Sequence, residues 1–188
     1  LYQYQHKILD LIGYIGGSFG LNYNGGSTRF SNGSPRNGTG KLGNWAWDWL
    51  GMYFYEFTFK SIKKGNDEYF LSINLVNDTG FFIGNKKDRA NSRTRLSAFE
   101  DVEKSETKLI FFLSKNIKQD YWADWTSDEF VLEEKGLKIK DEKITVLYKG
   151  YLLEDFDSEE KALSKLKDFE SYCTENGLNF KIKERKFE

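Results

Sequence analysis

Three side chains of the N-terminal half could together assist phosphodiester hydrolysis: the carboxylates of Asp48 and Glu56 and the ammonium of Lys60. Carboxylates can hold Mg²⁺ and, with a lysine, orient an attacking water. Glu56 and Lys60 are an even number of residues apart in a β-prone run, so an extended strand places them on one face. No Asp/Glu-x-Lys triplet lies on a predicted strand with an Asp upstream. A small magnesium-dependent nuclease or phosphodiesterase is therefore only the alternative hypothesis, and the sequence favours a non-catalytic protein.

Other catalytic arrangements are missing or misplaced. Residues 38–43 spell G-x-G-x-x-G, but a Gly/Ser/Asn-rich stretch precedes them and a β-prone run follows. A phosphate loop instead leaves a strand and opens a helix. The single histidine, His6, has no evident local partner for general-base chemistry. The single cysteine, Cys173, lies on the apolar stripe of a predicted helix, where we expect a buried thiol. One cysteine also excludes a disulfide framework, and we expect no cofactor and no metal ion.

Aromatic residues make up 17% of the chain, enough for a large core and for exposed positions as well. Trp45, Trp47 and Trp49 are spaced by two, so an extended segment presents them on one face. A row of indoles can stack bases or anchor a protein partner. Core packing is the competing explanation for some of them.

Cationic side chains concentrate in two segments that flank the first predicted hairpin. If these segments converge, they form a positive surface suited to phosphates or to an acidic protein; if they diverge, they are ordinary solvated loops. With the three tryptophans, the predicted binding residues are Arg29, Arg36, Lys41, Lys86, Lys87, Arg89, Arg93 and Arg95.

Hydrophobic periodicity and turn residues predict the elements that must position these groups. In the N-terminal half we expect a helix over 4–15 that Gly16 and Gly17 end, a flexible Gly/Asn/Ser-rich loop over 22–44, strands over 50–60 and 68–76, and a third strand from 81–83. Pairing the two strands so that Lys60 lies opposite Glu68, and Phe57 opposite Leu71, gives one continuous apolar face.

The C-terminal half predicts several short strands and one strong helix. The strands are expected over 108–114, 130–132, 137–139, 143–147 and 178–183. The helix, over 158–176, is expected to have Asp157 as its N-cap, with Glu160 completing a capping box, and Gly177 as its stop. Its inner stripe is Ala162, Leu166, Phe169 and Cys173. We therefore predict one α+β domain over 1–188, with a mostly antiparallel sheet and the N- and C-terminal helices packed on one face.

The formal net charge of −1 conceals an asymmetry between the halves. Residues 1–96 carry a net charge of +5 and residues 97–188 a net charge of −6. Such a difference favours an anionic partner for the positive half, although the halves can also simply attract each other. No apolar run is long enough for a membrane span. The lone thiol favours a cytoplasmic location.

These features favour a non-catalytic recognition module, inhibitor-like or adaptor-like, that contacts an anionic partner through its basic loops and aromatic hairpin. The partner is expected to be an acidic protein surface, because the chain has a pI near 6.0 and lacks the overall basicity of many nucleic-acid binders. Nucleic acid is the other permitted partner. A structural subunit that assembles through its aromatic patch is a further alternative.

Overall fold

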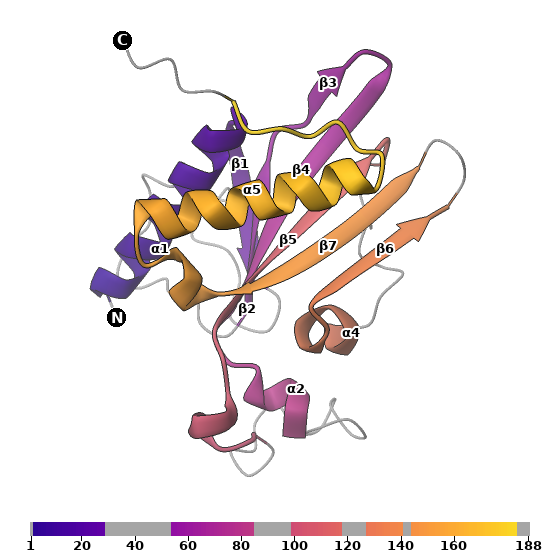
Figure 1. Ribbon diagram of the computed structural model, residues 1–188. Helices are drawn as coiled ribbons and strands as arrows, with labels where there is room; N and C mark the ends of the chain where they lie inside the picture. Colours follow the sequence, from indigo (N-terminus) through magenta and orange to yellow (C-terminus); the bar gives the residue numbers. More distant parts are fainter. Residues whose placement is uncertain (1, 29–53, 85–98, 118–126, 141–143, 184–188) are drawn as a thin grey trace.

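The computed structural model describes residues 2–28, 54–84, 99–117, 127–140 and 144–183. Within them, a seven-stranded antiparallel sheet has the strand order β1-β2-β4-β5-β7-β6, and β3 also pairs with β4. Helices α1 and α5 lie across one face of this sheet (Figure 1). The predicted α+β class is confirmed. The elements are α1 (Tyr2–Phe19), β1 (Tyr23–Thr28), β2 (Phe54–Phe59), β3 (Ile62–Lys64), β4 (Asp67–Val76), α2 (Gly80–Gly84), η3 (Val102–Lys104), β5 (Lys108–Lys115), α4 (Ser127–Leu132), β6 (Lys135–Ile139), β7 (Thr145–Leu152), η4 (Leu153–Phe156) and α5 (Glu159–Glu175).

The main core lies between the sheet and the two long helices. Odd-numbered residues of the central strands point into it, as the two-residue period of a strand requires. Phe19 of α1, Phe111 of β5 and Phe169 of α5 meet there, with ring centroids 6.2 Å apart for Phe19–Phe169 and 5.2 Å for Phe111–Phe169. The predicted stripe of α5 is buried in this layer, with Ala162, Leu166, Phe169 and Cys173 each at most 2% exposed.

The opposite face of the sheet carries a second apolar cluster, which two short helices cover. Phe81 and Phe82 of α2 and Phe130 of α4 pack there against even-numbered strand residues such as Phe112. Residues 81–83 and 130–132 were both predicted as strands, and both predictions are wrong. A short apolar run has no periodicity that distinguishes a buried strand from a buried helical turn. In α2, Thr79 O accepts hydrogen bonds from Phe82 N and Ile83 N, at 2.9 and 3.1 Å.

Helix α1 extends beyond the predicted stop at Gly16 and Gly17 and ends at Phe19, directly before Gly20, whose φ of +66° suits glycine. Gly16 lies against the ring of Phe59, where a Cβ atom would overlap the aromatic carbons. Gly16 therefore permits the close approach of α1 to β2 rather than a break in the helix.

The first hairpin is paired two residues away from the predicted register. Tyr55 faces Leu75 and Phe57 faces Ile73, whereas Glu68 lies opposite Lys63 of β3 rather than Lys60. The hairpin tip is a tight turn at 65–66, in which Gly65 has a φ of +64°. The position of this turn determines which residues of the two strands face each other. A shift of two residues keeps every side chain on its predicted face.

Residues 23–28, predicted as part of a loop, form the edge strand β1 beside β2. Its sequence, YNGGST, has no hydrophobic alternation, so its strand state comes from pairing with β2 rather than from its own side chains. Gly26 lies against Tyr55, where a Cβ atom would collide with the ring.

The N-cap of α5 is Ser158, whose Oγ accepts a hydrogen bond from Lys161 N at 3.3 Å. The prediction of Asp157 as the cap is wrong by one residue, and Asp157 forms an ion pair with Lys161 Nζ at 2.7 Å instead. Gly177 follows the helix with a φ of +73°, as expected of a stop. Residues 178–183 form no strand, yet Leu178 and Phe180 are buried in the main core.

Within the residues that the structure describes, no helix is both long enough and apolar enough to cross a membrane.

Candidate functional site

All the predicted binding residues lie outside the described residues, in the segments 29–53 and 85–98 that we call the two basic segments. They are Arg29, Arg36, Lys41, Trp45, Trp47, Trp49, Lys86, Lys87, Arg89, Arg93 and Arg95. Asp48, of the alternative hydrolytic site, lies outside them as well. What the structure does describe is where each segment leaves the fold and returns to it.

The ends of the two basic segments gather at one end of the sheet. Segment 29–53 leaves from Thr28 and returns at Phe54, on two strands that pair directly with each other. Phe54 in turn faces Val76, the last residue of β4, and α2 follows shortly after it. The second segment leaves from α2 and returns at Phe99, whose ring centroid is 5.3 Å from that of Phe81. Figure 1 shows α2 beside the end of the sheet at which β2 begins.

A strong charge imbalance accompanies this arrangement. The two basic segments hold eight Lys and Arg residues against only Asp48 and Asp88, whereas the whole chain has a net charge of −1. The rest of the chain is therefore clearly acidic. These eight cations therefore belong to segments that are attached at one end of the sheet, in a chain whose other residues carry a net negative charge.

The two described members of the alternative hydrolytic site differ in their access to solvent. Glu56 lies in the middle of β2, opposite Ser27 on one side and Asn74 on the other, and is only 5% exposed. Lys60 lies beyond the end of β2 and is exposed. Its backbone N–H donates a hydrogen bond to Asn22 O at 2.8 Å.

The lone histidine and the lone cysteine also have clear positions. His6 lies on the exposed side of α1, with its Nδ1 3.0 Å from Oδ2 of Asp10, one helical turn away. No such partner was predicted from the sequence. Cys173 is fully buried in the main core, and burial raises the pKa of its thiol well above the ordinary range. A thiol held in this protonated state is a poor nucleophile.

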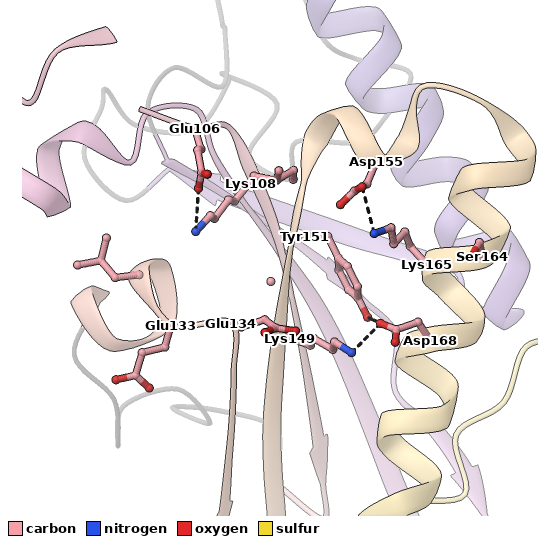
Figure 2. A pocket seen from close by; sticks show the side chains of 13 residues that line it. Glu106, Lys108, Glu133, Glu134, Lys149, Tyr151, Asp155, Ser164, Lys165 and Asp168 are labelled. Carbon is pink, nitrogen blue, oxygen red and sulfur yellow. Dashed lines mark hydrogen bonds and ion pairs between the residues drawn. The ribbon is translucent and has the colours of Figure 1, made fainter. Parts of the chain in front are cut away.

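A charged pocket of about 550 Å³ opens beside the outer side of β7, and we call it the β7 pocket. It exists because β6 begins at Lys135, opposite Lys149, so Tyr151 and Leu152 extend beyond the described end of β6. Figure 2 shows side chains of β7 and α5 reaching it from one side and those of Glu106 and Lys108 from the other. Its charged lining residues are Lys108, Lys149 and Lys165 and the five carboxylates of Glu106, Glu133, Glu134, Asp155 and Asp168.

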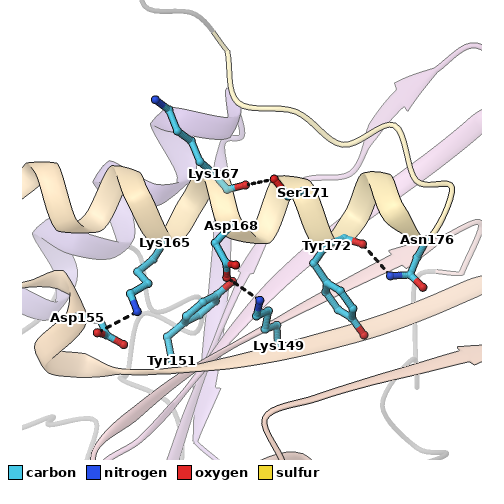
Figure 3. A network of polar contacts seen from close by, with 9 residues as sticks. All are labelled: Lys149, Tyr151, Asp155, Lys165, Lys167, Asp168, Ser171, Tyr172 and Asn176. Atoms are coloured by element: carbon cyan, nitrogen blue, oxygen red, sulfur yellow. Dashed lines mark hydrogen bonds and ion pairs between the residues drawn. The ribbon is translucent and has the colours of Figure 1, made fainter.

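A hydrogen-bonded network joins β7 to α5 at one wall of this pocket (Figure 3). Asp168 Oδ2 lies 2.7 Å from Lys149 Nζ and accepts a hydrogen bond from the Tyr151 hydroxyl at 2.8 Å. Burial by itself would raise the pKa of Asp168, but the hydrogen bonds from Lys149 and Tyr151 outweigh it and lower that pKa below its usual value. Burial, reinforced by Asp168, raises the pKa of Tyr151 far above its normal range.

The other lysines of the pocket are paired in the same way. Lys165 Nζ is 3.0 Å from Asp155 Oδ1, and Lys108 Nζ is 3.1 Å from Glu106 Oε2. Each ammonium thus has a carboxylate neighbour, and the carboxylates are in excess. The Lys149–Asp168 and Lys165–Asp155 pairs join neighbouring elements of the fold, whereas Lys108 and Glu106 are close in sequence. Because each of the three ammonium groups already has a carboxylate neighbour, the pocket is poorly suited to binding an anion. We interpret the charged side chains of the β7 pocket as structural contacts that hold α5 to β7 and η4.

This network was not predicted from the sequence, although its members form a pattern there. Lys149 and Tyr151 share one strand face, and Lys165, Asp168 and Tyr172 recur at helical spacing on one side of α5. That two such stripes face each other follows only from the packing of α5 over β7.

Among the described residues, no group of three or more His, Cys, Asp or Glu side chains is arranged to hold a metal ion.

The fold and the charge distribution define a class: an α+β protein with one antiparallel sheet, covered by two long helices, whose basic segments leave from one end. The chain belongs to the family described as PM0109, whose family model matches residues 1–179. No curated protein and no solved structure matches the chain.

Proposed function

We propose that this protein is a non-catalytic recognition module that binds an acidic protein surface through its two basic segments. The observation that carries the proposal is the common origin of these segments: their ends meet where β1, β2, β4 and α2 come together. Segments attached at neighbouring points can act on the same partner, since neither has to cross the sheet to reach it.

The scaffold supports this role because it is rigid where the segments attach. Phe54, Phe81 and Phe82 are each at most 2% exposed and belong to one apolar cluster. Glu100 N–H donates a hydrogen bond to Gly80 O at 3.0 Å, which closes the base of the second segment. A firmly packed base fixes the points from which both segments leave the fold.

An acidic protein is favoured over a nucleic acid because the remainder of the molecule is acidic. A polynucleotide extending beyond the basic end would meet that acidic surface, whereas a compact acidic patch can be matched by the basic end alone. The buried free thiol of Cys173 fits a reducing compartment and so supports a cytoplasmic location.

The test measures binding of a fluorescent poly-glutamate peptide by anisotropy, at low and at high salt. We expect binding that weakens strongly as salt is raised. The triple variant Arg89→Glu, Arg93→Glu, Arg95→Glu should lose it. The matched control is Lys167→Glu, Lys181→Glu, Lys183→Glu, which makes the same charge change at three exposed lysines of α5 and the segment after it. This control should keep at least half of the wild-type affinity.

Two outcomes would overturn the proposal. Equal loss in both triple variants would mean that only overall charge matters. Tighter binding of a single-stranded oligonucleotide than of poly-glutamate, lost in the Arg89/Arg93/Arg95 variant, would replace the acidic protein by a nucleic acid.

The alternative, a magnesium-dependent phosphodiesterase that uses Asp48, Glu56 and Lys60, has a separate test. It requires magnesium-stimulated hydrolysis of bis(p-nitrophenyl) phosphate that Glu56→Gln abolishes. The 5% exposure of Glu56 weighs against access of a substrate to this carboxylate.

A further inference from the structure

The outer strand β6 carries an open backbone edge with a defined set of donors and acceptors. Lys140 N–H donates to Ile144 O at 3.1 Å, and Gly150 N–H donates to Glu134 O at 2.8 Å. Hydrogen-bonded and non-hydrogen-bonded pairs alternate along an antiparallel ladder. The even-numbered residues of β6 therefore bond to β7, whereas Lys135, Leu137 and Ile139 direct their N–H and C=O groups outwards. In the described part of the chain, no strand pairs with this outer side.

The same three residues also alternate on one face of β6, and two of them are apolar and exposed. Leu137 is 38% exposed and Ile139 64% exposed. Leu137 lies opposite Leu147, a member of the main core, so the apolar side chains of β6 extend that core past its edge on the α5 face. An apolar strand edge of this kind is a site at which another strand can be added.

We propose that β6 pairs antiparallel with β6 of a second copy of this chain, with Leu137 on the two-fold axis. In this register Lys135 faces the second copy's Ile139, and Gly136 faces the second copy's Lys138. No lysine faces another lysine, and all five residues of the strand are paired.

The neighbouring registers are worse. Centring the pair on Lys138 would set two ammonium groups directly opposite each other, which is unfavourable. Centring it on Gly136 would leave Ile139, the most exposed apolar residue of the strand, outside the paired region. Of the registers centred on Gly136, Leu137 and Lys138, only the one centred on Leu137 makes the sequence KGLKI self-complementary.

The side chains around the strand fit this arrangement. Lys135 Nζ lies 5.4 Å from the ring centroid of Tyr172, so its ammonium is held towards α5. Its aliphatic stem is then available to cover the second copy's Ile139. On the other face, Gly136 lies against the Tyr148 ring, where a Cβ atom would overlap the aromatic carbons. The Gly136 contact keeps β6 close along β7, and the Lys135 contact holds β6 to α5. The strand is thus fixed in place for a continuous two-molecule sheet.

The contact is small, because it consists of one five-residue strand from each copy. Stable complexes usually bury on the order of 1,200 Å² or more. We therefore expect a dimer that forms as concentration rises rather than a permanent one. Sedimentation equilibrium over a range of loading concentrations should show the average mass of the wild-type chain rising from one copy towards two.

The register is tested by charge placement. Ile139→Lys sets a new ammonium opposite the second copy's Lys135 and should leave the protein monomeric, with a loss of association of at least tenfold. Adding Lys135→Glu to this variant restores an oppositely charged pair and should restore the dimer. Circular dichroism checks the fold, and the exposure of Ile139 means that its replacement should not perturb the monomer.

Val102→Lys is the matched control, since Val102 of η3 is also apolar and is 86% exposed. It should dimerise like the wild type. A wild-type chain that stays monomeric at its highest soluble concentration would overturn the proposal. So would an Ile139→Lys variant that dimerises normally, or a double variant that does not recover. None of these outcomes bears on poly-glutamate binding, which depends on the two basic segments.

Discussion

The ammonium of Lys149 on β7 lies 2.7 Å from the carboxylate of Asp168 on α5, and it is almost enclosed by the surrounding side chains. The side chain of Lys149 is 11% exposed, whereas that of Asp168 is 48% exposed. The rings of Tyr151 and Tyr172 flank the ammonium, at 5.7 and 5.5 Å from their centroids. A cation in this position depends on its carboxylate partner far more than the carboxylate depends on it.

Asp168→Asn should therefore destabilise the protein. The change leaves a nearly buried ammonium without its counter-charge and weakens the acceptor of the Tyr151 hydroxyl. We expect a decrease of about 1–2 kcal/mol in the free energy of unfolding, since the half-exposed carboxylate limits the effect. Urea denaturation measures it. Asp157→Asn is the control, because Asp157 also lies 2.7 Å from a lysine but both side chains of that pair are exposed. The control should leave stability unchanged.

The same pair predicts how this difference depends on pH. The pKa of Asp168 is lower in the folded protein than in the unfolded chain. Its contribution is therefore fully present above the unfolded value, about 3.9 for an aspartate, and is lost as pH falls through the folded pKa. The stability difference between wild type and Asp168→Asn should be constant near neutral pH and shrink below about pH 4. A difference that grows in acid would contradict this origin.

Two adjacent glycines of α1 should respond oppositely to alanine. Gly17 is exposed, and a Cβ atom there would meet nothing within 4 Å, so Gly17→Ala should stabilise the helix by about 0.5–1 kcal/mol. At Gly16 the added carbon would overlap the Phe59 ring. Gly16→Ala should therefore lower the melting temperature, while Gly17→Ala raises it. Equal effects at the two positions would mean that α1 does not approach β2 as described.

Cys173 should be unreactive in the folded protein. Its side chain is buried and its thiol pKa is raised, first by burial and then by Glu170. Ellman's reagent should modify no thiol under native conditions and one per chain in denaturant. Rapid native modification, at a rate like that of a free thiol, would show that α5 does not stay packed on the sheet.

The sequence predicted the class, the central strands and α5 because these elements have strong, regular patterns. It failed where the pattern was short or absent. The apolar runs of α2 and α4 are too brief to show a helical period, and β1 is a strand only because β2 lies beside it. The glycines of α1 resembled a stop because the reason for Gly16, close packing against Phe59, is a tertiary contact.

For the candidate site, the sequence identified the basic segments but not their common origin, since that depends on strand order. It also missed the Lys149–Asp168 pair, because the two residues are distant in the chain and each matches an ordinary solvated position in its own element. Facing stripes on a strand and a helix acquire meaning only once their packing is known.

Residues 178–183 hold the end of α1 in place: Lys183 N–H donates to Ser18 O at 2.8 Å, and the rings of Phe180 and Phe19 stack with centroids 4.7 Å apart. During translation, α1 leaves the ribosome long before residues 178–183, which pack against its end. The packing around Phe19 therefore cannot be completed until Phe180 has emerged from the ribosome, so this part of the main core forms late in synthesis.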